Sequence, residues 1–353
     1  MTTIFGIPSA ALFGQLLLGL INGSFYAILS LGLAVIFGLL NIINFTHGAQ
    51  YMMGAFVAWM LLNYAGIGYW PALVVAPIVV GALGILIERN LIAQLGNRSQ
   101  NRSFVLLGSG FVAFLILLYV LQRSPTEAFV GAIVVGLASA TAFGYFRPDE
   151  PSTEHVDHLY GLLLTFGLAL ILQGLFRNQY GVSGLPYGIP SQLTGGQNLG
   201  FMFMPNYRGW VVIASAIVCL ATWFIIEKTK LGAYLRAATE NATLVGAFGV
   251  NVPRMITLTY GFGVGLAAFA GVLAAPIYSV NPNMGADIII VVFAVVVIGG
   301  MGSILGSILT GFGLGLVEGL TKVFYPEASA TVIFVIMVLV LLVKPAGLFG
   351  RAA

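Results

Sequence analysis

The first 87 residues contain no Asp, Glu, Lys or Arg, because Glu88 is the first charged residue of the chain. Charged residues make up 7% of the 353 residues and hydrophobic residues 59%, against roughly 25% and 45–50% in soluble domains. So few charges cannot cover the surface of a soluble fold. The composition excludes a soluble enzyme, a nucleic-acid-binding protein and a disordered chain, and it indicates a protein embedded in membrane lipid.

The length of the apolar runs predicts membrane-spanning helices. A hydrocarbon core about 30 Å thick needs about 20 apolar residues of helix, whereas a transmembrane barrel shows alternating segments of about 10 residues. The apolar runs here are continuous and long, so we expect an all-α polytopic membrane protein with about 9–11 transmembrane helices. The expected spans lie near residues 10–40, 48–65, 70–91, 104–122, 128–146, 158–177, 208–227, 255–279, 287–303, 304–323 and 329–344.

The basic residues indicate one orientation, because Lys and Arg concentrate in short cytoplasmic loops. Counting the spans alternately places three basic clusters on the same side, with the N-terminus outside and the C-terminus in the cytoplasm. The cytoplasmic loop 228–254 is basic and polar, and the opposite loop 178–207 is rich in Gly and Pro. The three clusters are Arg89, Arg98 and Arg102; Lys228, Lys230, Arg236 and Arg254; and Lys344 and Arg351.

Two segments of the chain are similar to each other. The stretch NFTHGAQYMMGAFV from Asn44 and the stretch NPNMGADIIIVVFA from Asn281 align without gaps, and Gly48 then matches Gly285. The orientation places Asn44 on the cytoplasmic side and Asn281 outside. This is the relation of inverted repeats, in which discontinuous helices meet the substrate near the middle of the membrane.

Each copy of the repeat places polar residues and a glycine just before a new apolar helix. A helix that begins within the membrane presents unpaired N–H groups and the positive end of its dipole. The polar side chains can therefore cap these helix ends or line the path of a polar substrate. Asp287 is costly in a membrane, by about 2.5–3.5 kcal/mol at the centre, so it is either interfacial or functional. The candidate path residues are Asn44, Thr46, His47, Gln50, Asn281, Asn283 and Asp287.

The sequence gives little support for an enzyme. It contains no GxxxxGK[ST] phosphate loop, so we expect any ATP hydrolysis to take place on separate subunits. His155 and His158 stand beside acidic residues, but a hydrated loop explains them better than a metal site. We therefore expect no catalytic residues, no metal and no cofactor in this chain.

Several stretches carry a family resemblance. The segment NGSFYAILSLGLAVIFGLLNIINFTHGAQYMMGAFVAW resembles the N-terminal signature of branched-chain amino-acid ABC transporter permeases. The segments LRAATENATLVGAFGVNVPRMITLTYGFGVGLAAFAGVLAA, IGGMGSILGSILTGFGLGLVEGL and LLVKPAGLFGR are similar to later parts of that family, in family order. INFTHGAQYMMGA is closer to the H-type subunit than to its M-type partner.

The resemblance implies a pore-forming subunit of an importer in the bacterial inner membrane. Such a system pairs this chain with a second permease, either M-type or a copy of itself. It also contains two cytoplasmic ABC ATPase subunits and a periplasmic or lipid-anchored substrate-binding protein, and lipid surrounds it. A short polar cytoplasmic helix also suits an ATPase groove on physical grounds. The residues that match the family's coupling pattern are Arg236, Ala237, Glu240, Asn241, Gly246, Gly249 and Arg254.

The chain departs from the family pattern after ERNLIAQLGNRSQNR. Two additional apolar runs follow, and we interpret residues of about 100–155 as an inserted helical hairpin. We expect the whole chain, residues 1–353, to form one permease domain with its coupling segment at about 228–254.

These features predict ATP-driven uptake by alternating access. Branched-chain amino acids are the family's usual substrate, and urea, short amides and aromatic or other carboxylates stay open at this point. The alternative is a secondary transporter or channel for a small polar solute that acts without an ATPase. That alternative calls for coupling acids deep in several spans, and only Asp287 and Glu318 are candidates.

Overall fold

The structure is a computed structural model. It describes residues 3–4, 7–40, 43–92, 158–200 and 202–350, together with positions 131, 134–136 and 139. The expected spans 104–122 and 128–146, and most of the expected insertion at 100–155, lie outside the described residues.

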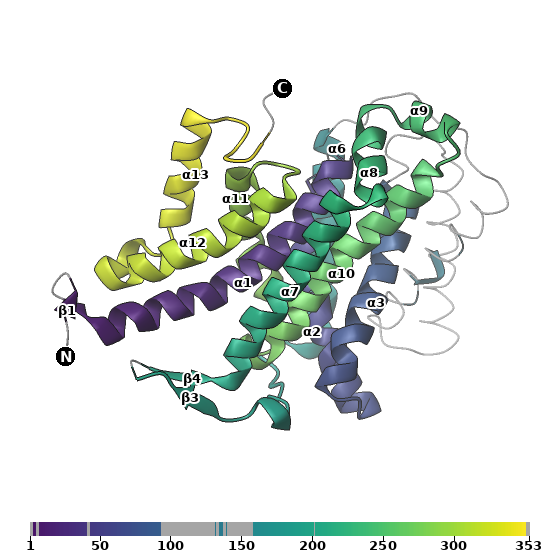
Figure 1. Cartoon of the computed structure of the whole chain (residues 1–353). Coiled ribbons are helices and arrows are strands. Elements are labelled where there is room, and N and C mark those ends of the chain that lie inside the picture. Colours follow the sequence, from purple (N-terminus) through teal and green to yellow (C-terminus); the bar gives the residue numbers. More distant parts are fainter. Residues whose placement is uncertain are drawn as a thin grey trace.

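The described residues are mainly helical (Figure 1). Two short strand pairs, β1 with β2 and β3 with β4, are antiparallel. The first half contains β1 (Thr3–Ile4), β2 (Ile7–Pro8), α1 (Ser9–Leu40), α2 (Thr46–Ala65), α3 (Tyr69–Ile87), the π-helical turn η1 (Glu88–Ile92) and α6 (His158–Tyr180). The second half contains η3 (Ser191–Leu193), β3 (Gly196–Asn198), β4 (Phe203–Pro205), α7 (Asn206–Lys228), α8 (Lys230–Glu240), α9 (Ala242–Ala247), α10 (Val252–Tyr278), α11 (Met284–Gly299), α12 (Ile304–Phe324), η4 (Pro326–Ala328) and α13 (Val332–Val343).

Six helices among the described residues are long and apolar enough to cross a membrane. They are α1, α3 with η1, α6, α7, α10 and α12, and α11 and α13 are shorter apolar helices. The prediction of an all-α polytopic membrane protein is therefore confirmed. The total of 9–11 spans stays a prediction, because it depends on α2, which is not among the six, on the shorter helices and on residues outside the described ranges.

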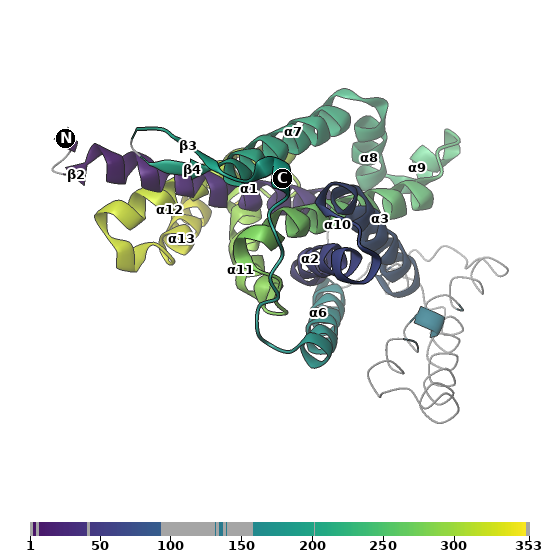
Figure 2. The same cartoon turned by 90° about the horizontal axis from the view of Figure 1, so that it is seen from below.

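The helices pack as two related groups of three. α1 packs on α12 and α10 packs on α3, while α1 also contacts α10 and α2 contacts α11. If α1, α2 and α3 are exchanged in that order with α10, α11 and α12, the same four contacts result. The contact of α1 with α12, for example, becomes the contact of α10 with α3. α1 and α10 also run in opposite directions (Figure 1). This is the arrangement expected of the inverted repeat, and α2 lies at its centre, against α3, α6, α10 and α11 (Figure 2).

Glycines allow the backbones of these helices to touch. A Cβ added to Gly23 on α1 would lie 3.0 Å from the carbonyl oxygen of Phe312 on α12. A Cβ on Gly81 of α3 would lie 2.9 Å from the carbonyl oxygen of Gly261 on α10. Small residues at helix interfaces are typical of packing in membranes, where close contact replaces the hydrophobic driving force.

The break between α11 and α12 lies at Gly300 and Gly302, which have φ of 101° and 81°. The predicted span 287–303 extends too far, because this backbone cannot continue a helix. The C-terminal segment 344–350 covers the end of α11 instead. Leu348 N–H donates to the Ile298 carbonyl at 2.8 Å, and Phe349 N–H donates to the Gly299 carbonyl at 3.1 Å.

The two loops expected to be long contain short elements at opposite ends of the molecule. The β3–β4 hairpin lies at the lower end in Figure 1, and α8 and α9 lie at the upper end. The C-terminal ends of α3, α7 and α13 also point to the upper end (Figure 1). The described members of the three basic clusters therefore share one end of the molecule, as the sequence predicts.

Candidate functional site

The two repeat motifs meet at their matched glycines. A Cβ added to Gly48 on α2 would lie 2.5 Å from the Gly285 carbonyl oxygen on α11 and 3.0 Å from Cβ of Ile289. A Cβ on Gly285 would likewise collide with the Gly48 carbonyl group. The first turns of α2 and α11 therefore cross with their backbones in direct contact.

The polar side chains of the first motif face the interior of the chain. Asn44, Thr46, His47 and Gln50, called here the buried polar group, are at most 2% exposed. Asn44 Nδ2 donates to the Tyr260 hydroxyl at 3.1 Å. Thr46 Oγ1 donates to the Thr165 carbonyl at 2.8 Å. The buried polar group thus joins α2 to α10 and α6.

His47 is fixed against α1. Its Nε2 lies 3.0 Å from the Leu29 carbonyl oxygen, which requires Nε2 to carry the proton. Gly32 makes room for the ring, because a Cβ there would lie 3.0 Å from Cε1 of His47. Gln50 lies beside His47 and Tyr260. Within the described part of the chain, its amide and His47 Nδ1 have no partner in good hydrogen-bond geometry.

The polar side chains of the second motif are more accessible than those of the first, since Asn281 and Asn283 are half-buried and Asp287 is exposed. Asn281, Asn283 and Asp287, called here the surface polar group, follow the end of α10. Gln173 on α6 donates to Asn283 Oδ1 at 3.0 Å, and the Asn283 N–H donates to Asn281 Oδ1 at 3.0 Å. Asp287 is exposed in the first turn of α11.

The structure thus brings the two motifs together but separates their side chains. The backbones touch at the glycines, while the buried and surface polar groups point to different environments. Neither α2 nor α11 has a side-chain N-cap, so capping of these helix ends does not explain the polar residues.

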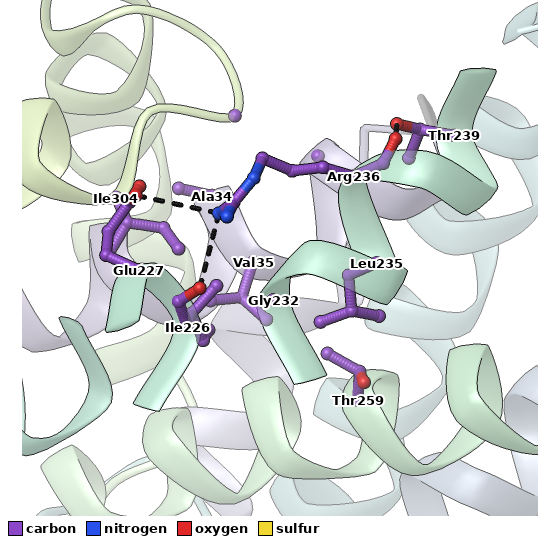
Figure 3. A pocket seen from close by; sticks show the side chains of 12 residues that line it. Ala34, Val35, Ile226, Glu227, Gly232, Leu235, Arg236, Thr239, Thr259 and Ile304 are labelled. Carbon is purple, nitrogen blue, oxygen red and sulfur yellow. Dashed lines mark hydrogen bonds and ion pairs between the residues drawn. The ribbon is translucent and has the colours of Figure 1, made fainter. Parts of the chain in front are cut away.

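The expected coupling segment forms α8 and α9, and all seven of its predicted residues are exposed. Arg236 nevertheless turns back to the end of α7 (Figure 3). Its Nη1 donates to the Ile226 carbonyl at 3.2 Å and lies 3.5 Å from Glu227 Oε2. Arg236 crosses a small pocket of about 80 Å³, partly open to solvent, that lies between α1, α7, α8, α10 and the start of α12.

Other coupling residues shape the segment itself. Asn241 caps α9, since its Oδ1 accepts from the Leu244 N–H at 2.8 Å. Gly249 has φ of 83°, a left-handed conformation that favours glycine at the end of α9. Ala238, Val245 and Val252 form a small apolar cluster that joins α8 and α9 to α10. This cluster holds the segment firmly on α10.

The most exposed large hydrophobic side chains of the segment were not among the predicted coupling residues. Phe248 is 81% exposed and Leu244 57% exposed. Apolar residues inside a polar loop are a detectable signal for both. Tyr260 and Thr165, which hold the buried polar group, give no such signal, because their partners are distant in the sequence.

No cluster of three or more His, Cys, Asp or Glu residues suited to a metal occurs in the part of the chain that the structure describes. His155, considered for metal binding from the sequence, lies outside that part.

Comparison with protein families identifies the chain. The model of the "Branched-chain amino acid transport system / permease component" family matches residues 15–121 and 99–341. The chain belongs to this family. As a permease component of an ABC transport system, it belongs to a class whose ATPase activity resides on separate subunits, so the alternative of a self-sufficient secondary transporter or channel is set aside.

Relatives cover almost the whole permease. The high-affinity branched-chain amino acid transport system permease protein LivH of Escherichia coli K12 is 28% identical over 346 residues, 96% of this chain and 95% of the relative. BraD of Pseudomonas aeruginosa, described in the same words, is 29% identical over 348 residues with the same coverage. LivM of Escherichia coli K12 is 27% identical over 328 residues but is covered only to 67%. The H-type resemblance is thereby confirmed. No solved structure gives a significant match.

Proposed function

We propose that this permease forms half of the membrane pore of an ATP-driven importer for branched-chain amino acids. The second half is an M-type permease or a copy of the same chain. Two cytoplasmic ATPase subunits and an extracytoplasmic substrate-binding protein complete the system. The observation that carries the proposal is the family match over most of the chain, together with LivH and BraD relatives that both belong to high-affinity branched-chain amino acid systems.

The end that carries α8 and α9 faces the cytoplasm in this proposal. The ends of α3, α7 and α13, with Arg89, Lys228 and Lys344, point to the same side (Figure 1). This supports the positive-inside orientation. The β3–β4 hairpin then lies outside, where it is available to the binding protein.

The ATPase contacts the surface of α8 and α9. Leu244 and Phe248 provide the apolar anchors, and Glu240 and Arg254 provide charges around them, since all four are exposed. Arg236 has a different role, because it ties α8 to the last turn of α7.

A movement of α8 and α9 reaches the pore through α10. The Ala238, Val245 and Val252 cluster joins the coupling segment to α10, and α10 packs on α1, α2 and α3. The pocket beneath Arg236 gives α8 room to shift against α1. The buried polar group lies between α1, α2, α6 and α10, so this movement acts on it directly.

The substrate path runs along the surface polar group in one state of the permease. When the helices around the buried polar group separate, that group also becomes part of the path. Unpaired amide and imidazole groups support the second part, because buried polar atoms without partners are costly and a solute or water relieves that cost.

The residues of about 100–155 form an inserted hairpin that contacts lipid or a partner subunit. This part of the proposal rests on the two additional apolar runs in the sequence, at 104–122 and 128–146.

The proposal is tested by uptake of radioactive leucine into proteoliposomes that contain the complete complex. The binding protein is added outside and ATP is enclosed. Uptake is expected only when ATP and the binding protein are both present. Uptake that persists without ATP, or a permease that purifies from native membranes without any ATPase, would contradict it.

A further inference from the structure

A second polar cluster joins α1, α10 and α12, outside both repeat motifs. It consists of Asn22, Tyr26, Tyr278, Glu318 and Lys322, and we call it the Glu318 network. Tyr26 OH donates to Glu318 Oε2 at 2.8 Å, and Asn22 Nδ2 donates to Glu318 Oε1 at 3.4 Å. Tyr278 OH donates to Asn22 Oδ1 at 3.0 Å. Lys322, one turn further along α12, forms an ion pair with Glu318 Oε1.

The network is buried on one side and open on the other. Glu318 is 8% exposed, while Tyr278 is 45% exposed and the Lys322 side chain 36% exposed. Glu318 and Lys322 both belong to the candidate membrane span α12. Charges in such helices are costly against lipid and typically face a partner or water. The open side is therefore expected to face a partner or water rather than lipid.

Further charges lie around the open side. Arg208, in the first turn of α7, is near enough to Tyr278 for its charge to act on that side chain. Asp287, of the surface polar group, acts in the same way on Tyr51, which in turn interacts with Tyr278. A positive and a negative side chain thus lie near Tyr278 and Tyr51, beside the Glu318 network.

We propose that the Glu318 network receives the zwitterionic head of the transported amino acid. Glu318 binds the α-ammonium group, and Lys322, which occupies that position in the present structure, moves aside to bind the α-carboxylate. One ion pair within the protein is thereby exchanged for two ion pairs with the solute. Tyr26 and Asn22 position the Glu318 carboxylate throughout. This inference rests on the proposed function, since it assigns the substrate head group for that same pore.

The chemistry of the network favours a zwitterion over an uncharged solute. A carboxylate with two neutral donors and one partly exposed cation is matched to an ammonium group, which carries three N–H donors and can replace Lys322 beside Glu318. Urea or a short amide carries no charge. Its binding would separate Glu318 from Lys322, and the solute would provide no new ion pair to offset the cost of that separation.

The competing explanation is that Glu318 and Lys322 only hold α12 together. The two explanations differ when both charges are removed. A purely structural ion pair can be replaced by neutral residues of similar size with little loss, because no single charge is left uncompensated. A recognition site loses its function in the same double variant.

The test is leucine uptake by reconstituted complexes that carry Glu318→Gln with Lys322→Gln. The control is Glu327→Gln, an acid that is exposed in η4 after the end of α12. Complex yield and the ATPase activity stimulated by the loaded binding protein are measured on the same samples. We expect the double variant to assemble and hydrolyse ATP normally while its leucine uptake falls at least tenfold, and the control to match the parent.

Uptake by the double variant within twofold of the parent would overturn the inference. If the double variant loses complex yield and uptake in parallel, Glu318→Asp with native Lys322 is measured as a second variant. The inference is also overturned if Glu318→Asp does not restore both complex yield and uptake. Failure of the proposed function is a separate result, because it requires the unmodified complex itself to show no ATP-dependent leucine uptake.

Discussion

Gly300→Ala offers the sharpest test of how the C-terminal segment holds the permease together. Gly300 follows α11 with φ of 101° and ψ of 120°, a conformation that residues with a Cβ rarely adopt. A Cβ at this position would lie 2.8 Å from Gly350 Cα and 3.0 Å from the Ala346 carbonyl oxygen. The substitution therefore strains the backbone and pushes segment 344–350 away from α11.

The expected cost follows from these two effects. The backbone conformation costs about 1–3 kcal/mol for a residue other than glycine. Displacing the segment breaks the hydrogen bonds from Leu348 and Phe349 to α11, each contributing about 0.5–1.5 kcal/mol. Together they lower the free energy of unfolding by about 2–6 kcal/mol, or the melting temperature by roughly 4–12 °C at about 2 °C per kcal/mol.

Cys219 allows this to be measured in detergent. It is the single cysteine of the chain and is 1% exposed, so its reaction with a thiol dye reports unfolding. Gly313→Ala is the matched control, because no atom lies within 4 Å of a Cβ at that helical position. The control should be unchanged or up to about 1 kcal/mol more stable. Equal melting temperatures for Gly300→Ala and the parent would refute the reasoning.

Three further outcomes are expected. Gly48→Leu should destabilise the fold by more than the about 1–3 kcal/mol of ordinary overpacking, and Gly174→Leu, with open space around it, should not; equal thermal stability of the two would contradict the helix crossing. Glu240→Lys, and more strongly Phe248→Ser, should lower the amount of ATPase that copurifies while membrane insertion is retained; unchanged copurification of both would exclude this contact surface. Tyr260→Phe should cost about 1–3 kcal/mol, because Asn44 loses a buried acceptor, and an unchanged melting temperature would count against that hydrogen bond.

The helices were largely predictable because lipid imposes a simple rule on the sequence. Each span needs about 20 apolar residues with all its backbone groups paired internally. The expected span 208–227 and the observed α7, Asn206–Lys228, differ by two residues or fewer at either end. The coupling helices were predictable as a segment, since charge returns to the chain there.

The environment of the polar residues was not predictable in the same way. His47 and Asp287 both stand within two residues of a matched glycine, Gly48 or Gly285, yet one is fully buried and the other is exposed. The difference depends on which helices cover each motif, and some of those helices are more than 100 residues away in the sequence, as with Thr46 and Thr165. The Glu318 network was also not predictable from the sequence, because Asn22 and Glu318 lie 296 residues apart.

The contact between Gly48 and Gly285 has a mechanical consequence. Two helices whose backbones already touch cannot move closer at that point, and no side chain lies between them to be compressed. α2 and α11 therefore cannot close further at this point, and any relative movement between them is a rotation about the contact. Because Gly48 and Gly285 lie in the first turns of their helices, such a rotation moves the C-terminal ends of α2 and α11 while their first turns stay together. The contact is thus expected to act as a fixed pivot for the rest of both helices.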